Sequence, residues 1–145
     1  MSPNRDPEVT PDGLARAATR VGDRWTLLVI ESLLPGPRRF GELSDALAGI
    51  APNILTKRLR QLEQSGLVVS APYSERPVRL AYELTAMGKE LAGALTLLAS
   101  WGARADGYEG SHRHDACGTA TEVRHWCPTC EVIVETLEDD GVTWA

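Results

Sequence analysis

The segment from Gly22 to Leu84 limits the possible folds of this chain more than any other feature. Its apolar spacing and its Pro and Gly residues predict three helices followed by two strands. These five elements span residues 24–34, 42–47, 52–65, 67–73 and 80–84. A further helix is predicted at 14–21, with Asp12 as its N-cap. The expected fold class is therefore mainly α with a small β-hairpin, an α+β domain.

The predicted helix at 52–65 has one apolar and one polar face. Leu55, Leu59 and Leu62 recur at helical spacing and are expected in the core. The other face carries polar and basic side chains: Asn53, Thr56, Lys57 and Arg60, with Arg58 at the flank. Basic residues on a helix are usually only a solvated face. A basic helix that follows a short helix and a tight turn is, however, typical of the recognition helix of a helix-turn-helix.

The two strands that follow are expected to form a β-wing over residues 67–84. Further basic side chains lie in the wing and before the second helix: Arg38, Arg39, Arg76 and Arg79. The order of elements therefore predicts a winged helix-turn-helix that binds double-stranded DNA. We expect Lys57 or Arg58 to contact base edges and Arg76 and Arg79 to contact phosphates, with the reverse assignment left open.

The charge distribution fits this prediction, although the chain of 145 residues has a net charge of −5. Residues 24–79 contain eight Lys and Arg against five Asp and Glu, whereas residues 80–145 contain four against eleven. The basic excess thus coincides with the predicted DNA-binding elements. The length suits one domain with an appendage. We expect a flexible arm at 1–11, the winged domain at 12–108 and an extension at 109–145.

Four blocks of the central segment resemble the HxlR-type regulators, a branch of the winged helix-turn-helix proteins related to the MarR-like family. The blocks are GDRWTLLVI at 22–30, GPRRFGEL at 36–43, LTKRLRQLEQSGLV at 55–68 and YELTAMGKEL at 82–91. The resemblance covers residues 12–108 and implies a bacterial transcriptional regulator that binds a pseudo-palindromic operator as a homodimer. The first helix and a long last helix at 85–108 would form the dimer interface. A small-molecule effector is an open partner.

Two positions depart from the pattern of the family. Many HxlR-type relatives carry a reactive cysteine where this chain has Asp12, so that thiol-based sensing mechanism is absent here. Ala51 stands where Ser or Thr would cap the recognition helix, and such a cap contributes about 1 kcal/mol. The first departure changes the expected signal, whereas the second only weakens the start of one helix.

All three cysteines lie in the extension, as His114-x2-Cys117 and, nine residues later, Cys127-x2-Cys130. Two pairs of soft ligands on tight turns predict a tetrahedral, structural zinc site in a zinc-ribbon-like hairpin. His112 and His125 are alternative ligands. A redox dithiol at Cys127 and Cys130 is the competing interpretation, although a reducing cytoplasm disfavours a stable disulfide.

No Ser, His and acidic residues form a recognisable nucleophile and base, so an enzyme is not expected. No secretory leader or apolar run of about 20 residues is present, which predicts a cytoplasmic protein without a membrane partner. The alternative function is a protein-interaction module, or a thiol- or metal-responsive switch, that uses the winged fold and the Cys-rich tail without sequence-specific DNA contacts.

Overall fold

The computed structural model describes residues 12–108 and 112–134. The arm predicted at 1–11 lies outside the described residues. The chain divides into two compact units, of which Leu14–Thr96 is one and the residues from Leu97 onward belong to the other. Each unit is described by itself.

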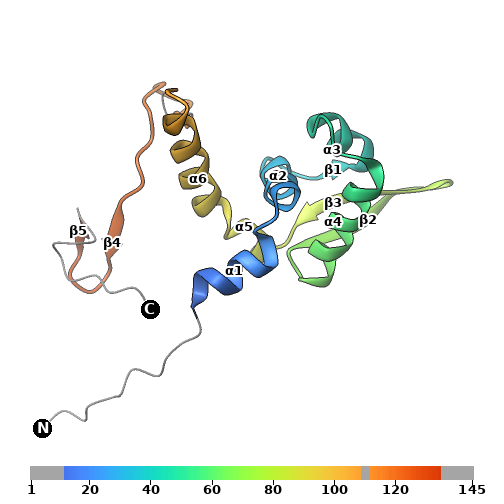
Figure 1. The fold of residues 1–145 in the computed structure, drawn as a ribbon, viewed down its shortest axis with the longest axis horizontal. Coiled ribbons are helices and arrows are strands. Elements are labelled where there is room, and N and C mark those ends of the chain that lie inside the picture. Colours follow the sequence, from blue (N-terminus) through green and yellow to red (C-terminus); the bar gives the residue numbers. More distant parts are fainter. Residues whose placement is uncertain (1–11, 109–111, 135–145) are drawn as a thin grey trace, which may run out of the picture. The chain divides into compact units, whose positions relative to one another are not determined.

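The first unit contains the helices and strands predicted between residues 14 and 84 in the predicted order, together with a short strand at 38–39 and a short helix at 86–89. They are α1 (Gly13–Val21), α2 (Arg24–Leu33), β1 (Arg38–Arg39), α3 (Phe40–Ala46), α4 (Pro52–Gln64), β2 (Val68–Glu75), β3 (Val78–Leu84) and α5 (Ala86–Lys89). Helix α6 (Ala92–Ala105) spans the boundary between the units. Figure 1 shows these helices and the small antiparallel sheet, which confirm the α+β fold class.

Local chemistry explains where α2 and α4 begin and end. Asp23 caps α2, because its carboxylate accepts hydrogen bonds from the backbone N–H of Trp25 and Thr26, each at 3.1 Å. Pro52 opens α4, where its missing N–H costs nothing, and Ala51 before it provides no side-chain cap. Gly66 ends α4 with a φ of 70°, a conformation that glycine adopts without strain.

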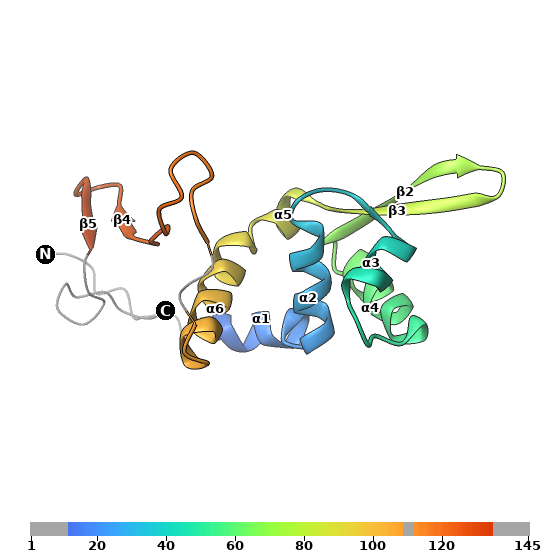
Figure 2. The ribbon, with the colours of Figure 1, turned by 90° about the horizontal axis from the view of Figure 1, so that it is seen from above.

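The sheet has the strand order β1-β3-β2 and is antiparallel throughout. Strands β2 and β3 form the wing, a long hairpin that extends beyond α3 and α4 in Figure 2. The wing lies where it is predicted, but its two strands are longer and its turn is shorter, since β2 continues to Glu75 and β3 already begins at Val78. Its outer part is exposed on both faces, so alternation of apolar and polar residues could not reveal it.

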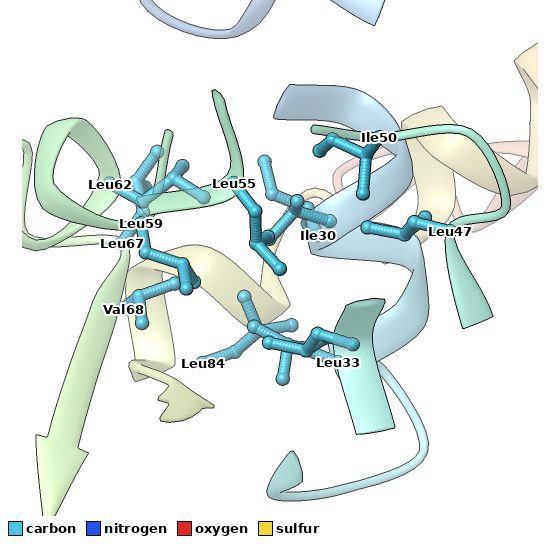
Figure 3. Close-up of a cluster of buried hydrophobic side chains, with 12 residues drawn as sticks. Ile30, Leu33, Leu47, Ile50, Leu55, Leu59, Leu62, Leu67, Val68 and Leu84 are labelled. Carbon is cyan, nitrogen blue, oxygen red and sulfur yellow. The ribbon is translucent and has the colours of Figure 1, made fainter. Parts of the chain in front are cut away.

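The hydrophobic core lies between α2, α3, α4 and the base of the wing. Figure 3 shows its side chains converging from these elements. The buried set is Val29, Ile30, Leu33, Leu43, Leu47, Ile50, Leu55, Leu59, Leu62, Leu67, Val68 and Leu84. The prediction that the apolar face of α4 is core is therefore confirmed. The same burial holds α4 with its opposite face turned to solvent.

The prediction of one helix at 85–108 is wrong, because α5 ends at Lys89 and α6 begins at Ala92. Gly88 and Gly93 flank the break, and glycine is a poor helix former. Gly88 also has a packing role. A Cβ at this position would lie 2.3 Å from the carbonyl oxygen of Leu67, so only glycine allows α5 to approach the start of the wing.

The extension contains one short hairpin in its described part. Strands β4 (His125–Cys127) and β5 (Val132–Val134) pair antiparallel, and an isolated bridge joins Arg113 to Ala120. Every residue from 112 to 134 is exposed or only partly covered. Among the described helices, none has the length and apolar character needed to cross a membrane.

Candidate nucleic-acid interface

A stripe of polar side chains follows the exposed face of α4. Its members line an open recess and are Asn53, Thr56, Lys57, Arg60, Gln61 and Gln64. They recur at intervals of three and four residues, so that they lie one above the other along the helix. We call this set the α4 stripe. It includes four of the five α4 residues predicted to contact DNA, and adds Gln61 and Gln64, which the sequence pattern did not single out.

Arg58 is the predicted α4 residue that lies apart from the stripe. Its guanidinium turns toward Asp23, with Nη2 donating to Asp23 Oδ2 at 3.0 Å. Nε lies 2.9 Å from Asp23 Oδ1, an ion-pair contact without hydrogen-bond geometry. Nη1 donates to Gln61 Oε1 at 2.8 Å. With these contacts made inside the domain, Arg58 joins α4 to the start of α2 instead of projecting to solvent.

Asp23 therefore has two functions at the same carboxylate. It caps α2 through the N–H groups of Trp25 and Thr26, and it holds Arg58 of α4. The side chains of Arg58 and Asp23 are 21% and 39% exposed, so the ion pair is partly shielded from water. The two residues lie 35 positions apart in the sequence, and their contact links α4 to the start of α2.

A second polar recess lies between the start of α3 and the wing. It is lined by Arg39, Phe40, Gly41, Glu42, Asp45, Tyr73, Arg79 and Leu80. The guanidinium of Arg39 lies over the ring of Tyr73, 4.3 Å from its centroid, a cation–π contact between β1 and the wing. The backbone N–H of Arg39 donates to Glu42 Oε2 at 2.7 Å. The recess therefore brings the predicted residues Arg39 and Arg79 to one place.

The remaining predicted wing and strand residues are distributed along the sheet. Arg79 lies on β3 opposite Ser74, and Arg76 lies in the turn between the two strands. Arg38 pairs with Tyr82 on β1 and is partly buried. Arg76 and Arg79 are thus exposed on the projecting hairpin, whereas Arg38 lies close to the core.

The four predicted zinc ligands are grouped as two pairs. His114 Nδ1 lies 3.4 Å from Cys117 Sγ, and the thiol of Cys130 hydrogen-bonds to Cys127. Over residues 12–108 and 112–134, no three His, Cys, Asp or Glu side chains lie close enough to hold one metal ion. The structure therefore shows each pair but does not bring the two pairs together.

Hydrogen bonds to sulfur change the acidity of these thiols. The side chain and then the backbone of Thr119 lower the pKa of Cys117. The backbone N–H and thiol of Cys130, with the N–H of Thr129, lower the pKa of Cys127. The same interaction and the negative charge of Cys127 raise the pKa of Cys130. In each pair, local hydrogen bonds thus lower the pKa of one cysteine.

The core, the solvent-facing stripe on α4 and the projecting β2–β3 hairpin define a winged helix-turn-helix protein. The family model described as HxlR-like helix-turn-helix matches residues 20–108. The chain belongs to this family.

Individual relatives agree with this assignment. An uncharacterized HTH-type transcriptional regulator of Mycobacterium tuberculosis is 39% identical over 123 residues, which cover 82% of this chain and 77% of the relative. The solved structure of a MarR-family transcriptional regulator from Enterococcus faecalis V583 has a TM-score of 0.59 and 35% identity, over 70% of this chain and 96% of that one. The reduced form of the transcriptional regulator YodB from Bacillus subtilis has a TM-score of 0.57 and 30% identity, over 66% and 93%. All three are similar proteins named as regulators and not as enzymes.

Proposed function

We propose that this chain is a transcriptional regulator that binds a pseudo-palindromic operator as a homodimer, through α4 and the β2–β3 wing. The observation that carries the proposal is the α4 stripe. It presents amide, hydroxyl and cationic groups to solvent on a helix whose other face is fixed in the core. Such a helix can enter the major groove, where Lys, Arg, Asn and Gln recognise base edges.

The stripe and the wing have different roles in this proposal. Lys57 and Arg60 lie on the stripe and are assigned to base edges or to the phosphates beside them. Arg76 and Arg79 lie on the projecting hairpin and are assigned to phosphates. Arg58 is assigned a positioning role, because its guanidinium is held by Asp23. This assignment replaces the expectation that Arg58 contacts a base.

The homodimer is supported by apolar side chains that α1 and α6 leave exposed. Leu14 on α1 is 78% exposed, while Leu98 and Trp101 on α6 are 50% and 62% exposed. Burying apolar side chains of this size away from water is favourable, and a second copy of the chain can cover them. The resemblance to HxlR-type regulators also implies that the first helix and the last helix form the dimer interface. A two-fold axis would then place two α4 helices in successive major grooves, about 34 Å apart.

DNA binding is tested by fluorescence anisotropy with an operator fragment taken from the region upstream of the gene. Lys57→Ala and Arg60→Ala are each expected to weaken binding by about 10- to 100-fold, which corresponds to the loss of one base or phosphate contact. Lys89→Ala is the matched control, because it removes an exposed charge from α5, where Lys89 pairs with Glu83 outside the stripe. Equal affinity of folded Lys57→Ala, Arg60→Ala and Lys89→Ala would refute the assignment of α4.

The oligomeric state is tested by sedimentation velocity. Leu98→Asp is expected to give monomers that bind the operator weakly, since it places a charge on the apolar surface of α6. Leu95→Asp is unsuitable, because Leu95 packs against the hydrophobic core and its loss would unfold the domain. A wild-type protein that sediments as a monomer at micromolar concentration would contradict the homodimer.

A further inference from the structure

The tail contains a cluster of four soft ligands that DNA binding does not use. Cys117, Cys127 and Cys130 are free thiols, and His114 lies beside the first of them. The family match ends at residue 108, so this cluster lies beyond it. Its geometry and its chemistry can therefore be considered independently of the proposed operator binding.

The first half of the cluster is a tight turn that places two ligand atoms side by side. Cys117 N–H and Gly118 N–H both donate to the carbonyl oxygen of His114, at 3.2 and 2.7 Å. Gly118 has a φ of 68°, which the turn requires and glycine allows. Bonds from zinc of about 2.3 Å to sulfur and 2.05 Å to nitrogen, at a tetrahedral angle, separate the two ligand atoms by about 3.6 Å. The observed distance of 3.4 Å between His114 Nδ1 and Cys117 Sγ fits that arrangement.

The second half is the turn of the β4–β5 hairpin. Glu131 N–H donates to the carbonyl oxygen of Cys127 at 2.8 Å, and Glu131 has a φ of 55°, which reverses the chain between the two strands. Cys127 ends β4 opposite Val132, and Cys130 follows three residues later in the turn between the two strands. Two cysteines at this spacing on a tight turn are typical ligands of structural zinc. Both cysteines of this turn are thus arranged as a two-ligand knuckle.

The described part of the tail buries little apolar surface. Trp126, Val132 and Ile133 of the hairpin are 58%, 52% and 50% exposed, so no apolar core forms there. The two pairs are separate, and no three ligands meet among the described residues. A segment with too little apolar burial to order itself is typically stabilised by a metal or by disulfides. The spacing of His114-x2-Cys117 and Cys127-x2-Cys130 favours the metal.

We propose that one zinc ion joins the two halves of the tail, with His114, Cys117, Cys127 and Cys130 as its ligands. Binding releases the thiol protons, and the closed shell of four protein ligands leaves no position for a reactive water. The ion is therefore structural, and its binding free energy orders the residues after the winged domain. His114 is assigned over His112 and His125, because its ring nitrogen already lies beside Cys117.

The test uses the full chain, purified under reducing conditions without added metal, and measures zinc per chain by elemental analysis. We expect one equivalent in the wild type and its loss in Cys117→Ser, Cys127→Ser, Cys130→Ser and His114→Ala. His112→Ala and His125→Ala are the matched controls and are expected to retain the ion. Cobalt titrated into chelated wild type is expected to give the visible absorption of a tetrahedral thiolate site, which disappears in Cys117→Ser.

Three results would overturn the proposal. The first is reduced wild type without zinc, which would leave Cys127 and Cys130 as a redox dithiol. The second is half an equivalent per chain with full retention in Cys117→Ser, which would indicate a site shared by two copies through Cys127 and Cys130. The third is retention in His114→Ala with loss in one of the control histidine variants, which would overturn the assigned ligand. Operator binding by the winged domain is measured in parallel, so that failure here is distinct from failure of the proposed function.

Discussion

The Asp23 carboxylate makes two kinds of contact: it caps α2, and it holds the guanidinium of Arg58 on α4. Asp23→Ala removes the cap, which contributes about 1 kcal/mol. It also removes the partner of Arg58. Because the two side chains are 39% and 21% exposed, this pair is treated as a partly screened ion pair of about 0.5–1 kcal/mol. The free energy of unfolding should therefore fall by about 2 kcal/mol, and Tm by about 10 °C for a domain of this size.

Asp23→Asn separates the two contributions. Asparagine caps helices as well as aspartate does, so this variant keeps the hydrogen bonds to Trp25 and Thr26 and loses mainly the charge. Its expected cost is about 0.5–1 kcal/mol, and raised ionic strength should reduce it further. A double-mutant cycle of Asp23→Asn with Arg58→Gln, followed by urea denaturation, measures the coupling directly. Equal losses in Asp23→Asn and Asp23→Ala, or zero coupling in the cycle, would refute this account.

Three further predictions follow from single side chains. Gly88→Ala should destabilise the domain by more than about 2 kcal/mol in thermal unfolding, because the added Cβ would lie 2.3 Å from the carbonyl oxygen of Leu67. Gly93→Ala is the control: its added Cβ would meet nothing within 4 Å, so this variant should stabilise α6 by up to about 1 kcal/mol. Arg58→Gln should keep operator affinity within about threefold of wild type in anisotropy titrations, since the loss of a base contact costs about 1–3 kcal/mol, or about 5- to 150-fold. Burial raises the pKa of Tyr82 above its ordinary 10.0, so the folded state keeps the phenolic proton at a higher pH than the unfolded state does. Wild type should therefore lose stability relative to Tyr82→Phe as the pH rises through and above 10. Parallel plots of stability against pH for the two proteins would contradict this.

The sequence pattern predicted the elements whose burial is periodic. The leucines of α4 recur at helical spacing because one face is in the core, and Pro52 and Gly66 mark the ends of that helix through local backbone chemistry. Both signals operate within a few residues of chain. This is why the helix-turn-helix and its solvent-facing side could be located without coordinates.

The role of Arg58 could not be predicted in the same way. Its partner Asp23 lies 35 residues earlier, and no local pattern indicates that the two meet. The break between α5 and α6 and the full length of the two wing strands were missed for related reasons. Gly88 is required by contact with Leu67, which is distant in sequence, and the outer wing has no buried face to impose alternation.

Selection of bound sequences from a random DNA pool by the full-length protein tests the central claim most directly. The account predicts two inverted half-sites whose centres lie about 10 base pairs apart, one for each α4 of a homodimer. It also predicts that at least one of Lys57→Ala and Arg60→Ala relaxes the preference at specific positions within each half-site, while Arg79→Ala weakens binding uniformly and lowers its salt dependence. Enrichment of no sequence, or of a preference that neither Lys57→Ala nor Arg60→Ala changes, would contradict the assignment of α4 as the recognition helix.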